Sequence, residues 1–373
     1  MKIGPLTVDP PVVLAPMAGV TNTAFRRVCR GFGGGLYVSE MITARALVEG
    51  NVRTLKMLSF APDERPRSVQ LYGVDPSTMA VAVTRLVDEL EVDHVDLNFG
   101  CPAAKVTRKG GGAALPLHHV LFERIVRAAV RAAGPIPVTV KLRLGVSDEL
   151  HTFLRCGLAA AGEGAAAVAL HARTAEQHYA GAADWSAIAE LRSVVPPDVP
   201  VLGNGDIWEA GDALAMVERT GCDGVVVGRG CLGRPWLFRD LADAFAGRPA
   251  QAQPRLGEVV AVMQRHLSLL CEHAGDEPGV RDFRKHLSWY LLGFPVGTAA
   301  RRAMALVEGR AELDERLALV AAEQGTIRMP DEARRLPRGH TTGPRRVVLP
   351  DGWLDHLDDP NPPAGAELLV SGG

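Results

Sequence analysis

The side chain best suited to chemistry is a cysteine on a short turn. It lies in residues 98–106 (NFGCPAAKV), which end an apolar stretch that alternates like a strand. A thiol with the ordinary pKa of about 8.5 keeps its proton at neutral pH and can give it to a carbanion-like centre. A lone Cys is more often a buried structural residue. Gly100 and Pro102 impose an unusual backbone path here, which favours Cys101 as a proton donor.

Basic side chains follow this thiol closely. Lys105, Arg108 and Lys109 precede the glycine run 110–112, so the thiol is expected beside cations on a mobile loop.

Composition narrows the classes of protein. The chain has 373 residues and a net charge of −2, so a polyanion would have to meet a local basic patch. Its six cysteines form no CxxC pair and no ligand cluster with His, which argues against disulfides and metal sites. We expect a cytoplasmic protein without a signal peptide or membrane span, because no apolar run reaches the length of about 18 residues that such a span needs.

Eight short apolar runs alternate with amphipathic helical stretches up to about residue 245. This pattern predicts an α/β fold of the TIM (β/α)8 barrel type, with an open eight-stranded sheet as the alternative. The expected strands are 12–15, 36–39, 68–71, 94–98, 138–143, 167–171, 199–203 and 224–227.

The predicted organisation has three parts. Residues 1–246 form the barrel, and a Pro- and Gln-containing linker follows. Residues 255–324 form a smaller all-helical domain, because helical periodicity continues there without strands. Residues 325–373 are rich in Pro, Gly and Arg and are expected to be a poorly ordered tail.

Polar residues end several of the expected strands. Gln70, Asn98, Lys141 and His171 all come at carboxyl-terminal strand ends, where barrel enzymes build their active sites. Alternation in 138–143 places Lys141 on the face opposite Val140 and Leu142. Taken singly, the Lys could be a surface side chain and the His a core residue.

Two late turns have the composition of a phosphate site. Residues 203–206 (GNGD) and 228–230 (GRG) follow the seventh and eighth strands, where glycines let backbone N–H groups approach a phosphate. Arg229 adds a positive charge. Either motif alone could be a simple tight turn.

A flat ring would fit between these turns and residues 15–19 (APMAG) after the first strand. An isoalloxazine has this shape. Gln70 could then donate and accept at its polar edge, while Lys141 could stabilise the negative charge that builds on reduction.

Together these motifs resemble the tRNA-dihydrouridine synthases, and their register resembles the bacterial B-type branch. The resemblance runs from the N-terminus to about residue 320. It rests on 15–19 (APMAG), 38–41 (VSEM), Gln70, 98–102 (NFGCP), 141–143 (KLR), 171–174 (HART), 204–207 (NGDI), 228–230 (GRG) and 234–236 (RPW).

The resemblance implies reduction of a uridine C5=C6 bond in tRNA by FMN, with NADPH or NADH as electron source and Cys101 protonating C5. FMN binding carries over to Pro16, Met17, Ala18, Gln70, Lys141, His171, Asn204, Gly205, Asp206, Gly228 and Arg229. Substrate binding is expected at Asn98, Lys105, Arg108, Lys109, Arg143, Arg173, Arg281, Arg284 and Lys285. The last three share one side of a predicted helix, which could instead be a basic face exposed to solvent. We expect a monomer that binds tRNA and neither DNA nor a membrane.

Other readings remain open at this stage. A flavin barrel acting on a free pyrimidine would use similar chemistry but would not need the basic helical domain. A tRNA-binding module without chemistry would not need Cys101. A flavin-free sugar-phosphate barrel would explain the glycine turns alone.

Overall fold

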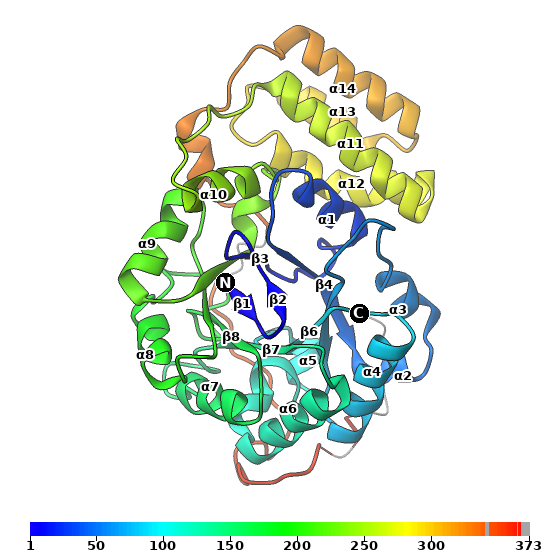
Figure 1. Cartoon of the computed structure of the whole chain (residues 1–373). Coiled ribbons are helices and arrows are strands. Elements are labelled where there is room, and N and C mark those ends of the chain that lie inside the picture. The colour runs from blue at the N-terminus through cyan, green and yellow to red at the C-terminus, as the bar shows by residue number, and fades with distance from the viewer. Residues whose placement is uncertain (340–342, 364, 367–373) are drawn as a thin grey trace.

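The computed structural model describes residues 1–339, 343–363 and 365–366, and its centre is a closed parallel barrel (Figure 1). The barrel strands are β3 (Val12–Leu14), β4 (Leu36–Thr43), β5 (Ser68–Tyr72), β6 (His94–Phe99), β7 (Val138–Arg143), β8 (Ala167–His171), β9 (Val201–Asn204) and β10 (Gly224–Val227). Pairing of β10 with β3 closes the ring. The predicted TIM barrel followed by helices is confirmed, and the open sheet is excluded.

Helices surround the barrel. They are α1 (Thr23–Arg30), α2 (Ala44–Val48), α3 (Val52–Met57), α4 (Pro76–Asp88), α5 (Ala104–Thr107), α6 (His119–Ala133), α7 (Phe153–Gly162), α8 (Ser186–Val194), α9 (Ala210–Thr220) and α10 (Leu237–Phe245). Helix α4 illustrates the local cause: Asp75 accepts from the Thr78 N–H, Pro76 fits the first turn, and Val83 and Leu86 face the core. The described part of the chain also contains the short 3-10 helices η1 (Gly112–Leu117), η2 (Arg229–Cys231) and η3 (Asp331–Arg335).

The barrel interior has an apolar half and a polar half. A hairpin of β1 (Lys2–Ile3) and β2 (Leu6–Thr7), absent from the sequence prediction, covers the amino ends of the strands and lies in front in Figure 1. Its buried Ile3 packs with the inward apolar residues of β3, β4, β8, β9 and β10. Strands β5, β6 and β7 instead point polar side chains inward: Ser68, Gln70, His94, Asp96 and Thr139.

Further helices form a layer beside α1 and α10 (Figure 1). They are α11 (Leu256–Ala274), α12 (Asp276–Tyr290), α13 (Thr298–Leu306) and α14 (Arg310–Gln324). Their apolar faces share one core with Ala24, Val28 and Trp236 of the barrel part. Two buried histidines, His266 and His286, lie in this core with ring centroids 4.5 Å apart.

The segment beyond residue 325 makes contacts that its composition does not predict. Trp353 is only 5% exposed and stacks on His118 of the barrel part with ring centroids 3.7 Å apart. Val347 is also buried. A single aromatic ring in a polar segment carries enough apolar surface to anchor it.

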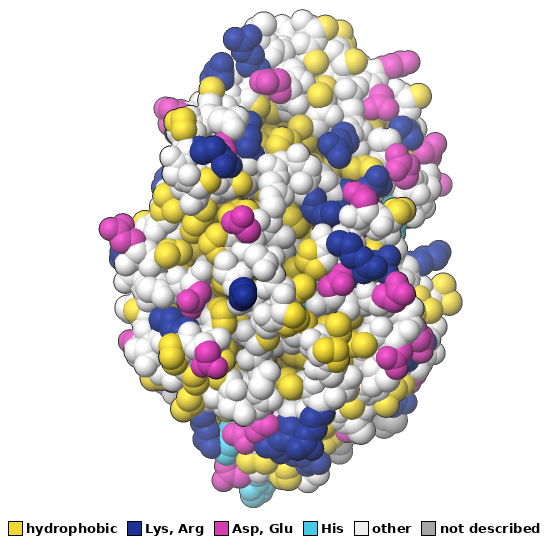
Figure 2. All heavy atoms as spheres, viewed as in Figure 1, with side chains coloured by type: hydrophobic (Ala, Val, Ile, Leu, Met, Phe, Trp, Pro, Cys, Tyr) yellow, Lys and Arg dark blue, Asp and Glu magenta, His cyan; other side chains and the backbone are white. Residues whose placement is uncertain are grey.

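The surface offers no single charged face in the view of Figure 2, where Lys and Arg side chains are interspersed with Asp and Glu. This view shows the hairpin side of the barrel. Among the described residues, no helix has both the length and the apolar content needed to cross a bilayer.

Buried histidines make the fold sensitive to acid. Burial lowers the pKa of His94 and of His266 to about 3 and holds that of His286 well below its usual range. As pH falls below about 6.5, these histidines become protonated in the unfolded chain before they do so in the folded protein. The folded protein therefore loses stability relative to the unfolded chain as the pH falls further. Asp96, whose pKa burial raises to about 6, acts in the opposite direction, as do Glu40 and Asp314, whose pKa values burial also raises.

We expect His286→Phe to reduce this acid sensitivity. Neither ring nitrogen of His286 has a partner among the described residues, so a phenyl ring keeps the packing and removes one proton site. Between pH 6 and 4, the fall in urea unfolding free energy should shrink by up to about 1.4 kcal/mol per pH unit. The exposed His151→Phe is the control and should keep the wild-type slope; an unchanged slope in His286→Phe would contradict the prediction.

Candidate active site

A cavity of about 340 Å³ opens at the carboxyl ends of the strands. Its volume is within the range of small-molecule sites, about 300–1,000 Å³. Every residue predicted to bind the cofactor lines it, as do four others from the prediction: Cys101, Asn98, Lys105 and Arg143. Six other predicted residues are not part of its lining: Arg108, Lys109, Arg173, Arg281, Arg284 and Lys285.

A chain of hydrogen bonds connects the barrel interior to the cysteine turn. The buried carboxylate of Asp96 accepts from the Thr139 hydroxyl and from the Gln70 amide, each at 2.6 Å. Gln70 in turn accepts from the Asn98 side-chain amide at 2.8 Å. The Asn98 carbonyl oxygen accepts from the backbone N–H groups of Gly100 and Cys101 at 3.1 and 2.9 Å. The turn is therefore held from inside the barrel.

The surroundings of Cys101 keep its thiol protonated. Burial raises the pKa of Cys101, and the backbone N–H of Ala103 and the charges of Arg143 and Lys105 offset this only in part. The thiol is thus an acid rather than a ready nucleophile at neutral pH. Helix α5, which carries Lys105, begins three residues further on.

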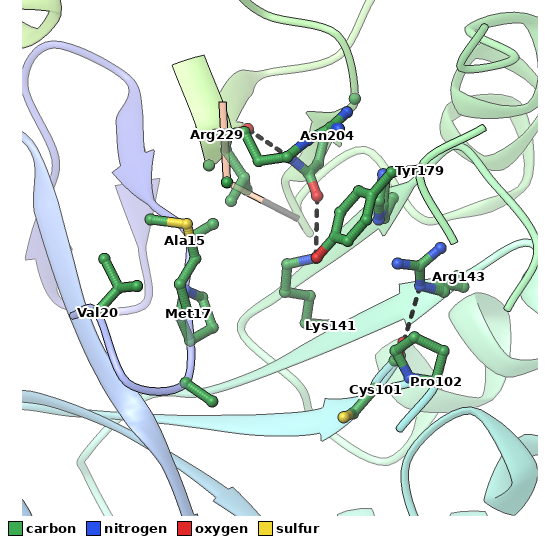
Figure 3. Close-up of a pocket in the computed structure, with 18 of the residues that line it drawn as sticks. Ala15, Met17, Val20, Cys101, Pro102, Lys141, Arg143, Tyr179, Asn204 and Arg229 are labelled. Carbon is green, nitrogen blue, oxygen red and sulfur yellow. Dashed lines mark hydrogen bonds between the residues drawn. The ribbon is translucent and has the colours of Figure 1, made fainter. Parts of the chain in front are cut away.

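Lys141 and His171 bring two different protonation states to the cavity. The Lys141 ammonium donates to the Asn204 side chain at 3.0 Å (Figure 3). Burial and Arg143 lower its pKa to about 8, against the opposing effect of Asp96, so it still carries its charge at pH 7. Burial and the nearby cations hold the pKa of His171 well below its usual range, so its imidazole is neutral.

Arg229 is fixed by two aromatic rings. Its guanidinium lies 4.3 Å from the ring centre of Tyr179 and 5.1 Å from that of Trp208. The Asp206 carboxylate lies 3.7 Å from the Arg229 guanidinium. It pairs more closely with the Arg173 guanidinium, at 2.7 Å, and it also accepts from the Ala183 N–H. The site therefore presents an excess of positive charge, which suits an anionic ligand.

Two arginines predicted to bind substrate donate to the protein itself. Arg143 is buried and donates to the carbonyls of Gly100, Thr174 and His178. Arg173 is buried and donates to Asp206 and to the carbonyls of residues 180 and 181. Arg143 reaches the cavity wall, whereas Arg173 acts behind it.

The three basic residues of α12 do not form one free face. Arg284 donates to the Val307 carbonyl at 2.7 Å, which ties α12 to the end of α13. Lys285 bonds to the Gly19 carbonyl and to Asp282, and so reaches the loop that carries Pro16 and Met17. Arg281 points outward, 67% exposed and 3.7 Å from Glu277. Helical spacing predicts a shared side but not these partners.

The sequence interpretation missed several residues of the cavity wall. Tyr179 and Trp208 come from irregular segments after β8 and β9, where no periodicity singles them out. Only their aromatic type, in a chain with four Tyr and five Trp, could have drawn attention to them. Gly339, from the segment expected to be poorly ordered, also lines the cavity.

Comparison with known proteins gives one consistent family. Residues 13–325 match the family model described as "Dihydrouridine synthase (Dus)". A "Probable tRNA-dihydrouridine synthase" of Mycobacterium tuberculosis is 55% identical over 382 aligned positions, covering 100% of this chain and 97% of that relative. A "tRNA-dihydrouridine synthase B" of Pseudomonas aeruginosa is 39% identical, covering 79% of this chain and 88% of the relative.

Solved structures support the fold. Histamine dehydrogenase from Rhizobium sp. 4-9 superposes with a TM-score of 0.52 at 12% identity, covering 88% of this chain and 64% of that chain. At this identity the likeness concerns the fold alone.

The Asp206–Arg173 pair gives a prediction for the site. Asp206→Ala leaves a fully buried guanidinium without its carboxylate, and we expect the urea unfolding free energy to fall by about 3 kcal/mol. Asp206→Asn should lose less, because one acceptor oxygen remains, and the exposed Asp198→Ala should lose almost nothing. Measurements with and without added flavin separate the roles: loss of flavin affinity at unchanged stability would assign Asp206 to the cofactor instead.

Proposed function

The chain belongs to the dihydrouridine synthase family, and from this membership we propose that it reduces the C5=C6 bond of uridine in tRNA, using FMN and NAD(P)H. The observation that carries the mechanism is the protonated thiol of Cys101 beside a cavity rich in cations. A free-pyrimidine reductase and a sugar-phosphate barrel are disfavoured by the family itself.

The cavity residues fit FMN. The backbone of Gly205, with φ of +133°, and the turn at Gly228 leave room for a phosphate, and Arg229 is held rigid near both. A Cβ at Gly205 would lie 2.6 Å from that of Ala183, so glycine is required there. Gln70 keeps one amide hydrogen and one lone pair free of the internal chain, and these could meet the polar edge of a flavin ring.

FMN, when bound by these residues, would supply the hydride for C6. The electron pair of the C5=C6 bond then needs a proton at C5, and the S–H bond of Cys101 breaks to provide it. The thiolate that remains faces Arg143 and Lys105, which stabilise its charge until solvent returns a proton. Lys141, charged at pH 7, would balance negative charge on the reduced ring.

The tRNA would approach from the carboxyl face of the barrel. Lys105 and Arg108 are exposed on and just after α5, next to Cys101, and Arg281 is exposed on α12. These side chains suit phosphate contacts, whereas Arg284 and Lys285 would act by holding α12 in place. We propose that the protein works as a monomer and in the cytoplasm, where a tRNA substrate would be met.

Replacing the thiol tests the mechanism. Cys101→Ala should retain flavin and its reduction by NADPH, yet form dihydrouridine roughly 10²–10⁴-fold more slowly, because no acid remains at C5. Product is measured by mass spectrometry of nucleosides from unmodified tRNA. Cys156→Ala, a buried cysteine on α7, is the matched control. Full activity in Cys101→Ala would exclude the thiol as proton donor, and no product in wild type with any tRNA would reject the function.

Salt dependence tests the tRNA contacts. Lys105→Ala with Arg108→Ala should weaken tRNA binding about equally for different tRNAs and lower the salt slope by roughly 0.7–0.9 per lost phosphate contact. Flavin content should not change. Arg131→Ala, on the opposite end of the barrel, is the control. An unchanged slope in the double variant would move the docking role to other residues, with Arg281 next.

A further inference from the structure

We propose that residues 343–363 form a strap across the barrel and that Trp353 is a positioning residue for the loop of Cys101. This inference rests on the proposed role of Cys101 as proton donor. It concerns a segment beyond residue 325, where the family match ends. We call residues 343–363 the strap.

Trp353 contacts the segment that follows Cys101 in the chain, namely η1 and His118. Its indole N–H donates to the Ala114 carbonyl at 3.0 Å, and its own carbonyl accepts from the His118 ring at 2.8 Å. The indole also stacks on that ring. Three contacts, two by the side chain and one by the backbone, thus fix Trp353 to η1 and the residue after it.

Those contacts reach Cys101 through a few tightly packed atoms. The Ala113 N–H donates to the Cys101 carbonyl at 3.0 Å, so η1 holds the thiol residue by its backbone. A Cβ on Gly112 would lie 2.5 Å from that same carbonyl, and one on Gly110 would lie 2.7 Å from the Trp353 ring. The indole, the two glycines and the thiol residue are therefore packed without room for a side chain between them.

Further contacts hold the strap on both sides of Trp353. Arg124 donates to the Pro360 carbonyl at 2.8 Å, and Asp358 lies 3.0 Å from His119. At the other end, the backbone N–H groups of Arg345 and Val347 donate to the backbone and side chain of Glu176. Glu176 precedes Tyr179 of the cavity wall by three residues, so the strap joins two loops of the active site.

The barrel interior holds the turn at Asn98, while the strap holds it from outside through η1. A thiol on a loop secured only from inside would sample more positions. Misplacement by about 1 Å can cost on the order of 10² in rate. The strap therefore restricts where the Cys101 proton can be delivered.

The test compares the full-length variant Trp353→Ala with wild type in two readouts. In flavin-loaded Trp353→Ala, Cys101 should react with iodoacetamide several-fold faster than in wild type. The pH midpoint of this reaction should move down toward that of an exposed thiol. Peptide mass spectrometry distinguishes labelling of Cys101 from labelling of the buried cysteines. With tRNA, kcat should fall on the order of tenfold with little change in KM.

Two variants separate positioning from stability. Trp353→Phe keeps the stacking but loses the N–H donor, so both readouts should be partly restored, and this variant still tests the idea if Trp353→Ala does not fold. Leu354→Ala, at an exposed neighbouring side chain, should match wild type. A lower melting temperature with unchanged Cys101 labelling and unchanged kcat would overturn the proposal. Faster labelling in a protein whose wild type makes no dihydrouridine would reject the function and leave the strap standing.

Discussion

The buried carboxylate of Asp96 is the constraint around which the active half of the barrel is arranged. A charge-bearing group in the barrel interior is costly unless its oxygens are hydrogen-bonded. Thr139 and Gln70 meet this requirement, and Gln70 in turn fixes Asn98. Because Asn98 holds the backbone of the cysteine turn, the need to satisfy one buried group determines where the thiol lies.

The requirement that buried polar groups have hydrogen-bond partners also shapes the cationic side of the cavity. Lys141 donates to Asn204 at the end of β9, and Arg173 donates to Asp206 in the loop that follows, so each of these two buried cations has a partner. Burial, together with the surplus of positive charge, keeps His171 neutral. A single site thereby offers a charged ammonium, a neutral imidazole and a protonated thiol at the same pH, and the proposed reduction uses the thiol and the ammonium.

Segments outside the barrel secure its loops. Helix α12 contacts the loop of Pro16 and Met17 through Lys285 and Gly19, and the strap contacts η1 through Trp353. A TIM barrel builds its active site from loops, which are the least constrained part of the fold. The helical layer and the strap supply the long-range contacts that the short loops lack.

Local patterns in the chain predict the strand order, the carboxyl-end placement of Gln70, Asn98, Lys141 and His171, and the thiol turn, because alternation and βα spacing are local properties. The partners of each side chain depend on tertiary packing. Spacing put Arg284 and Lys285 on one helical side, but only folding showed that Val307 and Gly19 occupy them. Composition likewise does not predict the contact of Trp353 with His118, because His118 lies in the barrel part, far away along the chain. Such contacts depend on how distant segments pack, and no local pattern encodes them.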